Sequence, residues 1–240
     1  MTRVLVTGAG GFWGVFLVNE LYRVGFSVRA GLRDSASIPL FPSGVETVVA
    51  DVRDGQKVKD AAVGCNAVVH LAAKVHAIYE HGANDDYETI NVAGTRHVLE
   101  AAVASGARRV VFVSTVKVFG ESTQGCVDET SPPNPRTPYG WSKWRAEQLV
   151  STYAQSRRLT SVSLRLPMVY GPTTKGNLYR LIAAIDRGWF PSLPCISTVR
   201  SMLYVKNFVL AVVAALTSEI LPRSMYVVTD EKPLLCDGSL

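Results

Sequence analysis

The sequence predicts an α/β protein built on a doubly wound parallel sheet. Short, β-branched apolar runs recur along the 240 residues and alternate with segments of helical spacing. Some runs, such as Val110–Val113, are apolar at every position, as in a sheet covered on both faces. Right-handed crossovers then place helices on both faces. The length and the 48% hydrophobic content suit one large domain, or one domain with a small appendage.

The expected elements follow from these runs and from the segments between them. Strands are predicted over Arg3–Thr7, Ser27–Leu32, Thr47–Ala50, Ala67–Leu71, Arg109–Ser114, Ser161–Leu166 and Met225–Val228. Helices are predicted over Val15–Val24, Gly55–Ala62, Asp85–Ala104 and Tyr139 to about Arg157. Asn91 and Gly94 are poor helix formers inside the third of these, which tolerates them more readily if Asn91 bonds across to a neighbouring strand. Residues 1–165 are expected to form the core, and residues 166–240 a small lobe interleaved with the last strands.

A glycine-rich turn joins the first strand to the first helix, reading Thr7-Gly8-Ala9-Gly10-Gly11-Phe12-Trp13-Gly14. A helix N-terminus offers unpaired N–H groups and a positive dipole end to a pyrophosphate. The pattern assigns Gly8 to the tight turn, Gly11 to close approach of phosphate and Gly14 to helix packing. Phe12 and Trp13, which lie within this turn, join the predicted cofactor site. The alternative, a glycine-rich turn that binds nothing, is disfavoured by the flanking strand and helix.

The end of the second strand reads Leu32-Arg33-Asp34, where dinucleotide-binding folds place the group that contacts the adenosine ribose. Arg33 favours NADP because a guanidinium can bind a phosphate through two hydrogen bonds. Asp34 leaves NAD open, and an Arg-Asp surface turn is a third interpretation. NAD or NADP is therefore predicted, with a slight lean to NADP. After the third strand, Asp51, followed by Val52, is expected near the adenine, or else Asp51 caps the helix beginning at Gly55.

Small residues follow the fourth strand, in His70-Leu71-Ala72-Ala73, where a backbone must lie against a cofactor. Leu71, Ala72 and Ala73 are therefore predicted cofactor contacts. His70 is interpreted as a core histidine rather than a catalytic base, since it has no carboxylate neighbour in sequence. The other histidines, His76, His81 and His97, lack metal-ligand spacing, and no metal is predicted.

Tyr139 and Lys143 are four residues apart on a predicted helix, which places both side chains on one face. A phenol titrates near pH 10 in water, so it needs a nearby cation to act as a base at neutral pH. Lys143 could supply that charge. Ser114 and Thr115 end the fifth strand, where a hydroxyl could hold the same substrate oxygen in line for proton transfer. The sequence thus predicts a catalytic group of Thr115, Tyr139 and Lys143.

Charge and cysteine content restrict the class of protein. A formal charge of +5, with basic residues scattered along the chain, argues weakly against nucleic acid as a partner. The four cysteines show no C-x-x-C spacing and suggest reduced thiols. The chain has no apolar signal core, and the apolar segment Phe208–Leu216 is too short to span a bilayer. These features predict a soluble cytoplasmic protein with no membrane partner.

Taken together, the motifs resemble the extended short-chain dehydrogenase/reductase family, in its branch of nucleotide-sugar epimerases, dehydratases and 4-keto-reductases. The resemblance rests on the glycine turn, His70–Ala73, Asn91, Ser114-Thr115 with Val118-Phe119-Gly120, Tyr139 with Lys143, and Pro167–Pro172. It implies a Rossmann fold, cofactor contacts from Asn91, Ser114 and Pro167, and a UDP-linked sugar as substrate. It also implies that Thr115 and Tyr139 bind the sugar 4-oxygen while Lys143 holds the nicotinamide ribose. Homodimerisation through a helix pair is an expectation of the resemblance alone.

Two departures from the family pattern refine the expected reaction. Hexose 4,6-dehydratases of the family carry an Asp-Glu pair after the threonine, whereas this chain has Val116-Lys117, so a dehydratase is set aside. Lys117 could stabilise oxyanion charge or simply face solvent. Asn177 and Arg200 match positions that contact the nucleotide diphosphate in the family, and a surface arginine is the alternative for Arg200. Ser201 and Tyr204 depart from the family residues beside that arginine.

The C-terminal lobe looks cut short, because family members continue well beyond Met225–Val228 while this chain ends at Leu240. The main expectation is an NAD(P)-dependent nucleotide-sugar 4-epimerase or 4-keto-reductase. One alternative is a truncated dinucleotide-binding module with little or no turnover. Another is a short-chain reductase of a non-sugar carbonyl, which would use the same catalytic residues.

Overall fold

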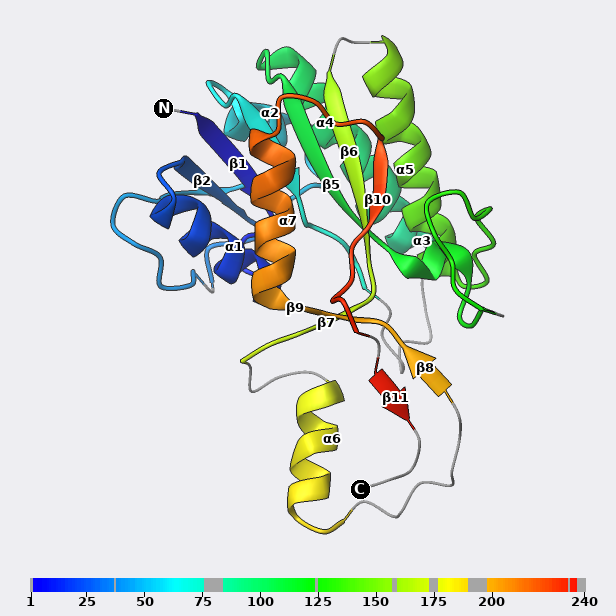
Figure 1. The fold of residues 1–240 in the computed structure, drawn as a ribbon. Coiled ribbons are helices and arrows are strands. Elements are labelled where there is room, and N and C mark those ends of the chain that lie inside the picture. Colours follow the sequence, from blue (N-terminus) through cyan, green and yellow to red (C-terminus); the bar gives the residue numbers. More distant parts are fainter. Residues whose placement is uncertain are drawn as a thin grey trace.

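The computed structural model describes residues 2–36, 38–75, 84–123, 125–156, 159–172, 177–189, 198–232 and 234–236. Its main body is one sheet of seven parallel strands in the order β10-β6-β5-β4-β1-β2-β3 (Figure 1). The strands are β1 (Arg3–Thr7), β2 (Ser27–Leu32), β3 (Glu46–Val49), β4 (Ala67–His70), β5 (Arg109–Thr115), β6 (Thr160–Leu166) and β10 (Met225–Val227). The predicted doubly wound sheet is confirmed.

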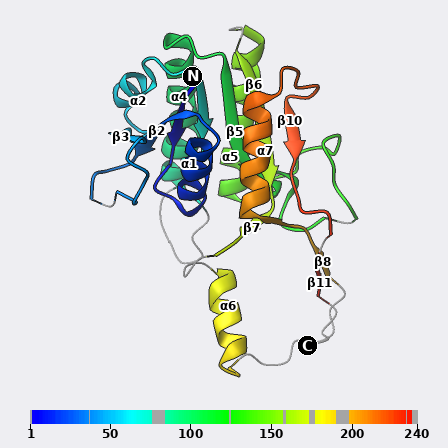
Figure 2. The same cartoon turned by 60° about the vertical axis from the view of Figure 1, so that its left-hand side comes forward.

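Helices cover both faces of this sheet. On one face, α1 (Phe12–Arg23) and α7 (Val205–Thr217) pack side by side, and Figures 1 and 2 both show them there. The other face carries α2 (Gly55–Ala62), α4 (Gly94–Ala104) and α5 (Pro138–Ser156). The central strands contribute buried side chains to both layers, for example Val4 and Val6 to one and Leu5 to the other. Burial on both faces explains why these strands read as continuous apolar runs.

The strand order reverses direction between β1 and β4. The chain first winds outward through β2 and β3, and then returns to place β4 on the other side of β1. In open α/β sheets, ligands bind beyond the carboxyl ends of the strands at such a switch point. The glycine turn leaves β1 at this point. The fold therefore places the predicted cofactor site where the sheet leaves a crevice.

A small lobe lies beyond the carboxyl ends of the strands, at the bottom of Figures 1 and 2. It contains α6 (Asn177–Asp186) and the antiparallel pair of β8 (Thr198–Arg200) with β11 (Leu234–Cys236). A second pair, β7 (Met168–Tyr170) with β9 (Met202–Tyr204), connects it to the main body. After β9 the chain returns to the main body, because α7 packs on the sheet and β10 pairs with β6.

The segment predicted as one helix over Asp85–Ala104 has three parts. It begins with a short helix, α3 (Asn84–Asp86), continues as the π-helix η1 (Tyr87–Ala93) and ends as α4. Asn91 and Gly94 lie in and next to the π-helical stretch, in agreement with their poor α-helix propensity. Single-turn π-helical insertions are rare and occur often at functional sites. A 3₁₀ turn, η2 (Val116–Phe119), follows β5.

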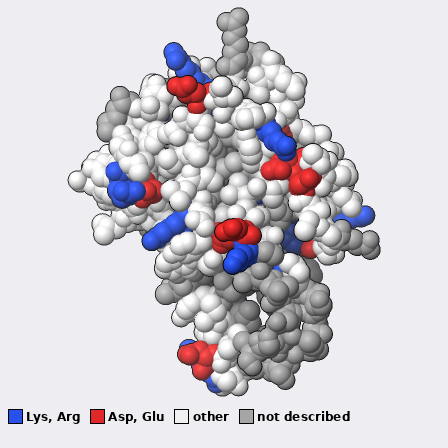
Figure 3. Space-filling view, in the orientation of Figure 1, with Lys and Arg blue, Asp and Glu red and all other residues white. Residues whose placement is uncertain are grey.

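The surface is mixed in charge. Figure 3 shows basic and acidic side chains next to each other on the face drawn, without a broad basic patch. Exposed pairs such as Arg53–Asp51 and Arg145–Glu88 are examples of this pairing. Across the described ranges, no helix is both long enough and apolar enough to cross a bilayer.

Candidate active site

The glycine turn is compact because backbone atoms occupy the space that side chains would need. Gly8 has φ +72°, and a Cβ there would lie 2.7 Å from the backbone N of Ala72. At Gly14, a Cβ would lie 2.5 Å from the carbonyl oxygen of Gly8. The amide of Gly11 donates to that same oxygen at 3.1 Å. The tight turn at Gly8 and the close helix packing at Gly14 are thus both present in the structure.

The helix that follows begins with N–H groups that have no partner within the helix. Gly11 is the N-cap residue of α1 and has extended φ/ψ, so the amides of Phe12 and Trp13 lie in the first turn, where helix geometry provides no partner. Their side chains pack elsewhere: the ring of Phe12 lies 5.3 Å from that of Phe16, and the ring of Trp13 lies 5.9 Å from that of Phe208. A role for these two residues in binding a pyrophosphate therefore falls to their backbone.

The residues predicted around the adenosine lie at the carboxyl ends of β2 and β3. Arg33 and Asp34 form an exposed ion pair, with Arg33 Nε 3.1 Å from Asp34 Oδ2, as in the surface-turn interpretation. Asp51 pairs with Arg53 and accepts its backbone amide at 3.0 Å. The helix-cap interpretation of Asp51 is wrong, because the cap of α2 is Asp54, whose carboxylate accepts the amides of Gln56 and Lys57.

Val52 and the segment after β4 are held in place by residues of the η1–α4 segment. Val52 is buried, and its carbonyl lies 2.8 Å from His97 Nδ1. Asn91 Oδ1 accepts the amide of Lys74 at 2.8 Å, and its Nδ2 donates to the Lys74 carbonyl at 3.0 Å. Asn91 therefore bonds to the chain just beyond Leu71–Ala73 and not to a residue of a strand. Asn91 Nδ2 also donates to Ser142 Oγ at 2.9 Å, which joins this segment to α5.

Tyr139 lies in the first turn of α5, beside the end of β5. Burial raises the pKa of Tyr139 to about 12, a hydrogen bond from Thr115 lowers it, and nearby Tyr87 raises it. The rings of Tyr87 and Tyr139 are 6.3 Å apart. The structure therefore brings Thr115 and Tyr139 together as predicted. It adds Tyr87, which the sequence did not single out because η1 and α5 are far apart in the chain.

Lys143 lies one turn beyond Tyr139 and is 3% exposed. Its Nζ donates to the carbonyl of Val113 at 2.7 Å and sits 4.0 Å from the ring centroid of Phe112. Burial lowers the pKa of Lys143 to about 7, while the negative charge of Glu147 raises it. An ammonium in this position is half ionised near neutral pH, so small changes in its surroundings alter its charge.

His70 is a core histidine, as predicted. It is 1% exposed and bonds through Nδ1 to Thr7 Oγ1 at 2.7 Å and through Nε2 to Thr95 Oγ1 at 3.0 Å. Burial, with a smaller contribution from Lys143, lowers the pKa of His70 to about 3. The imidazole is therefore neutral at physiological pH, and it joins β1, β4 and α4 beneath the glycine turn. His76 and His81 lie outside the described residues.

Two further predicted cofactor contacts lie close to this group. Ser114 is 3% exposed, and its Oγ has no hydrogen-bond partner among the described residues. A buried hydroxyl without a partner is costly and points to a group that completes it when bound. Pro167 is buried between β6 and β7, at the carboxyl edge of the sheet. Both positions fit a nicotinamide in the crevice.

The predicted substrate contacts are spread over the small lobe and η2. Lys117 forms an ion pair with Glu121, and its side chain is 38% exposed. Arg200 is exposed at the end of β8, where it pairs in register with Leu234. Asn177 begins α6, and its side chain lies outside the described residues. Among the interactions that the structure describes, none joins Lys117 to the hydroxyl of Tyr139.

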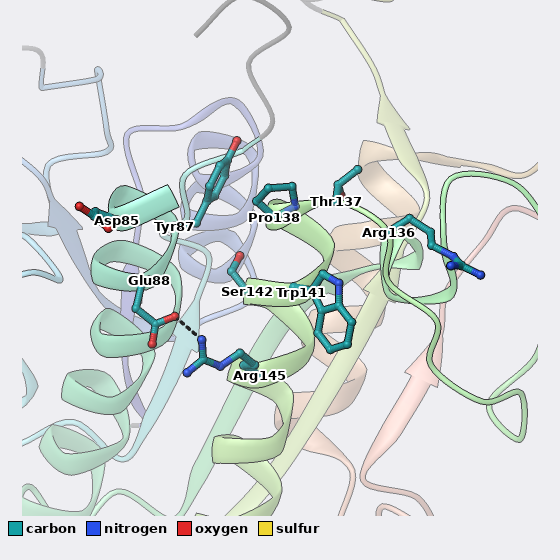
Figure 4. Close-up of a pocket in the computed structure, with 9 residues that line it drawn as sticks. All are labelled: Asp85, Tyr87, Glu88, Arg136, Thr137, Pro138, Trp141, Ser142 and Arg145. Carbon is teal, nitrogen blue, oxygen red and sulfur yellow. Dashed lines mark hydrogen bonds and ion pairs between the residues drawn. The ribbon is translucent and has the colours of Figure 1, made fainter. Parts of the chain in front are cut away.

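A cavity of about 670 Å³ opens beside the start of α5. Its lining comes from α3, η1, the two residues before α5 and the N-terminal part of α5, and comprises Asp85, Tyr87, Glu88, Arg136, Thr137, Pro138, Trp141, Ser142 and Arg145. In Figure 4 the Glu88–Arg145 ion pair, 2.7 Å between Oε2 and Nη1, lies at its lower end, and Tyr87 and Trp141 present aromatic surface. The lining combines charged groups of both signs with aromatic rings. No sequence pattern predicted it, because its residues meet only in the fold.

The family model of the NAD dependent epimerase/dehydratase family matches residues 4–228. One relative, the N-acetyl-alpha-D-glucosaminyl-diphospho-ditrans,octacis-undecaprenol 4-epimerase of Escherichia coli O157:H7, is 33% identical over 216 residues, which cover 86% of this chain and 61% of the relative. A second, the 2-alkyl-3-oxoalkanoate reductase of Stenotrophomonas maltophilia, is 33% identical over 214 residues, which cover 87% of this chain and 63% of the relative. This chain thus spans about three fifths of the length of these relatives.

Solved structures extend the likeness to the fold. The UDP-glucose 4-epimerase of Thermus thermophilus in complex with NAD superposes with a TM-score of 0.82 at 29% identity, and the match covers 98% of this chain and 79% of that chain. The glycine turn at the switch point, the buried Ser114 hydroxyl and the Tyr139–Lys143 helix fit a nicotinamide dinucleotide. The chain belongs to the NAD dependent epimerase/dehydratase family, of the extended short-chain dehydrogenase/reductase type.

Proposed function

We propose that this chain is an NAD(P)-dependent nucleotide-sugar 4-epimerase or 4-keto-reductase that acts at C4 of a UDP-sugar. The observation that carries the proposal is the grouping of Thr115, Tyr139 and buried Lys143 at the carboxyl end of β5, at the same edge of the sheet where the glycine turn leaves β1. Relatives and solved structures that carry epimerase names support the reaction class. When bound, the dinucleotide supplies the hydride acceptor and donor.

The chain's own residues would handle the proton. With its pKa raised to about 12, Tyr139 is protonated at neutral pH and can donate a proton to a 4-keto oxygen as that oxygen is reduced. Thr115 would hold the same oxygen and align it. In the reverse direction, loss of the phenol proton needs nearby positive charge, and Lys143 is the buried cation one turn away. Val116 and Lys117 stand where dehydratases of the family carry their acid and base.

The substrate and cofactor assignments follow from the same positions. Arg200 and Asn177 are proposed to contact the nucleotide diphosphate, and Lys117 the sugar. For the cofactor, we propose contacts from the glycine turn with the amides of Phe12 and Trp13, from Asp51, Val52 and Asn91, from Leu71–Ala73, and from Ser114, Lys143 and Pro167. Arg33 gives NADP a slight preference over NAD, since its exposed guanidinium could leave Asp34 for a 2′-phosphate. A homodimer remains an expectation of the family.

The test is to incubate the protein with UDP-glucose, UDP-galactose and a UDP-linked 4-keto-6-deoxy sugar. Nicotinamide absorbance and the configuration at C4 are followed with NAD and with NADPH. A change at C4 without net cofactor consumption indicates an epimerase, and consumption with the keto sugar indicates a reductase. If none of these substrates reacts with either cofactor, the proposal is wrong.

A second candidate is a reductase of a non-sugar carbonyl, favoured by the 33% identity to the 2-alkyl-3-oxoalkanoate reductase. Such an enzyme could use Thr115 and Tyr139 on a ketone in the same way. NADPH consumption with a 2-alkyl-3-oxoalkanoate but not with UDP-sugars would favour it. A third, a binding module with little turnover, predicts calorimetric binding of NAD or NADP without binding of UDP.

A further inference from the structure

A buried ionic cluster lies behind the catalytic turn of α5. It consists of Lys143, Glu147 and Arg165, which are 3%, 8% and 4% exposed. Lysine, glutamate and arginine are rarely buried to this degree unless they are paired, because removing their charges from water is costly. The proposed reaction uses Lys143 but assigns no role to the other two residues.

Glu147 and Arg165 tie α5 to the sheet. Arg165 Nε lies 3.0 and 3.2 Å from the two carboxylate oxygens of Glu147, and its Nη2 lies 2.7 Å from Oε2. The guanidinium also stacks over the ring of Phe119, with Cζ 4.6 Å from the ring centroid. Because Glu147 is on α5 and Arg165 on β6, this bidentate pair fixes the helix against that strand.

The same helix is tied to the neighbouring strand one turn earlier. Lys143 Nζ donates to the carbonyl of Val113 on β5 at 2.7 Å. Two successive turns of α5 are thus bonded to two adjacent strands. These bonds restrict both rotation and sliding of the helix, and Tyr139 lies just one turn before the first of them.

Glu147 is also placed to act on the charge of Lys143. Residues four apart on a helix share a face, and the negative charge of Glu147 raises the pKa of Lys143. The other titratable or charged groups nearby in the described part of the chain are His70 from β4, whose pKa the charge of Lys143 lowers, Tyr139 one turn earlier on α5, and Arg165 from β6, which is paired with Glu147. His70 and Tyr139 are neutral at pH 7, with pKa values of about 3 and about 12, and Arg165 is positive. Within this group, the favourable charge for an ammonium comes from Glu147.

We propose that Glu147, anchored by Arg165, is a positioning residue that keeps Lys143 charged and holds the turn of α5 that presents Tyr139. The catalytic meaning of this proposal rests on the proposed function. The ionisation of Lys143, however, can be measured without turnover. A test can therefore contradict the role of Glu147 without contradicting the proposed function, and the reverse.

The experiment is an NMR pH titration of the full chain labelled with ¹³C at lysine Cε, with the Lys143→Arg variant assigning the resonance. Glu147→Gln should lower the pKa of Lys143 by about one unit, because it removes the opposite charge. Arg165→Gln should raise the pKa, because it removes a like charge and frees Glu147. Shifts of opposite sign are therefore expected. If both variants raise the pKa of Lys143, the Glu147–Arg165 pair only keeps water out. If neither variant changes that pKa, Glu147 has no electrostatic role. Either result overturns the proposal.

Glu147→Gln leaves a buried guanidinium without its carboxylate and could prevent folding. The double variant Glu147→Gln/Arg165→Gln avoids this, because it leaves neither charge unpaired. Its Lys143 pKa should lie below that of Arg165→Gln alone, and an equal or higher value overturns the proposal.

The matched control is Glu147→Asp, which keeps the charge. With an active substrate, the limb of the kcat–pH profile that follows Lys143 should move in Glu147→Gln in the same direction as the NMR pKa, and should move less in Glu147→Asp. A profile that stays fixed while the NMR pKa moves would contradict the catalytic part of the proposal. An inactive wild-type chain whose NMR shifts have the expected signs would contradict the proposed function and leave the assignment of Glu147 intact.

Discussion

Replacing Gly14 with alanine should weaken dinucleotide binding, because the added Cβ would enter the backbone of the turn. That Cβ would lie 2.5 Å from the oxygen of Gly8 and 2.6 Å from the oxygen of Ala9. The helix start must retreat by roughly 0.9 Å to restore ordinary contact, which begins at 3.4 Å. Overpacking of this kind costs about 1–3 kcal/mol of stability. The retreat also moves the amides of Phe12 and Trp13, which are proposed to bind the pyrophosphate.

The expected loss of affinity follows from those amides. A hydrogen bond to a charged group contributes about 1.5–3 kcal/mol, so misplacing one amide should raise the Kd for NAD by roughly ten- to a hundredfold. Calorimetric titration with NAD and denaturant unfolding measure the two effects separately. The matched control is Gly10→Ala, whose Cβ would meet only side-chain atoms, the flexible end of Leu32 at 3.3 Å and Pro39 at 4.0 Å. If Gly14→Ala binds NAD within twofold of the wild type while remaining folded, the pyrophosphate does not lie at this turn.

Three further predictions concern other parts of the site. Tyr139→Phe should lower kcat by about a hundredfold or more, since it removes the proton donor. The Kd for NAD, measured by calorimetry, should stay unchanged. Retained turnover would exclude Tyr139 as the proton donor. Because the pKa of His70 is about 3 when folded and 6.5 when unfolded, the unfolded chain binds the extra proton, so folding stability should fall as pH drops from 6.5 towards 3. Urea unfolding of His70→Gln should show a flatter pH dependence over that window, and an equally steep one would refute the assignment. Asp230→Ala should lower the free energy of unfolding in urea by about 1–2 kcal/mol, and Asp230→Asn should lower it less. The reason is that Asp230 accepts the amide of Tyr204 at the start of α7 and bonds to Tyr170 and Asn207. Equal losses in both variants would contradict this.

Local sequence patterns predicted those parts of the site that depend on neighbouring residues. The glycine turn is one such part, since the strand, the glycines and the helix are contiguous, and β1 and β2 begin and end at the predicted residues. Tyr139 and Lys143 are another, because their spacing alone sets a shared face on α5. One of the two interpretations of Asp51 made it the cap of α2; this was wrong, because an N-cap directly precedes the first helical residue and Asp54 holds that position.

Long-range partners could not be predicted from the sequence. The ion pair of Glu147 with Arg165 joins α5 to β6, and Asp230 reaches back to β7 and β9, so neither shows any local pattern. The short strands of the small lobe were missed because each spans three residues, too few to show an alternating pattern. The continuous apolar runs, in contrast, predicted the buried central strands, because burial on both faces restricts every position.

The glycine turn and Tyr139 are proposed to serve a single hydride-transfer reaction at a sugar carbon. The most direct measurement mixes the NAD-loaded protein with a UDP-hexose, follows nicotinamide reduction by absorbance, and determines the C4 configuration of the sugar by NMR. We expect a reduced-nicotinamide signal and a sugar altered at C4, with both absent in Tyr139→Phe. No reduction and no change at C4, in a chain that binds both NAD and UDP, would contradict this claim.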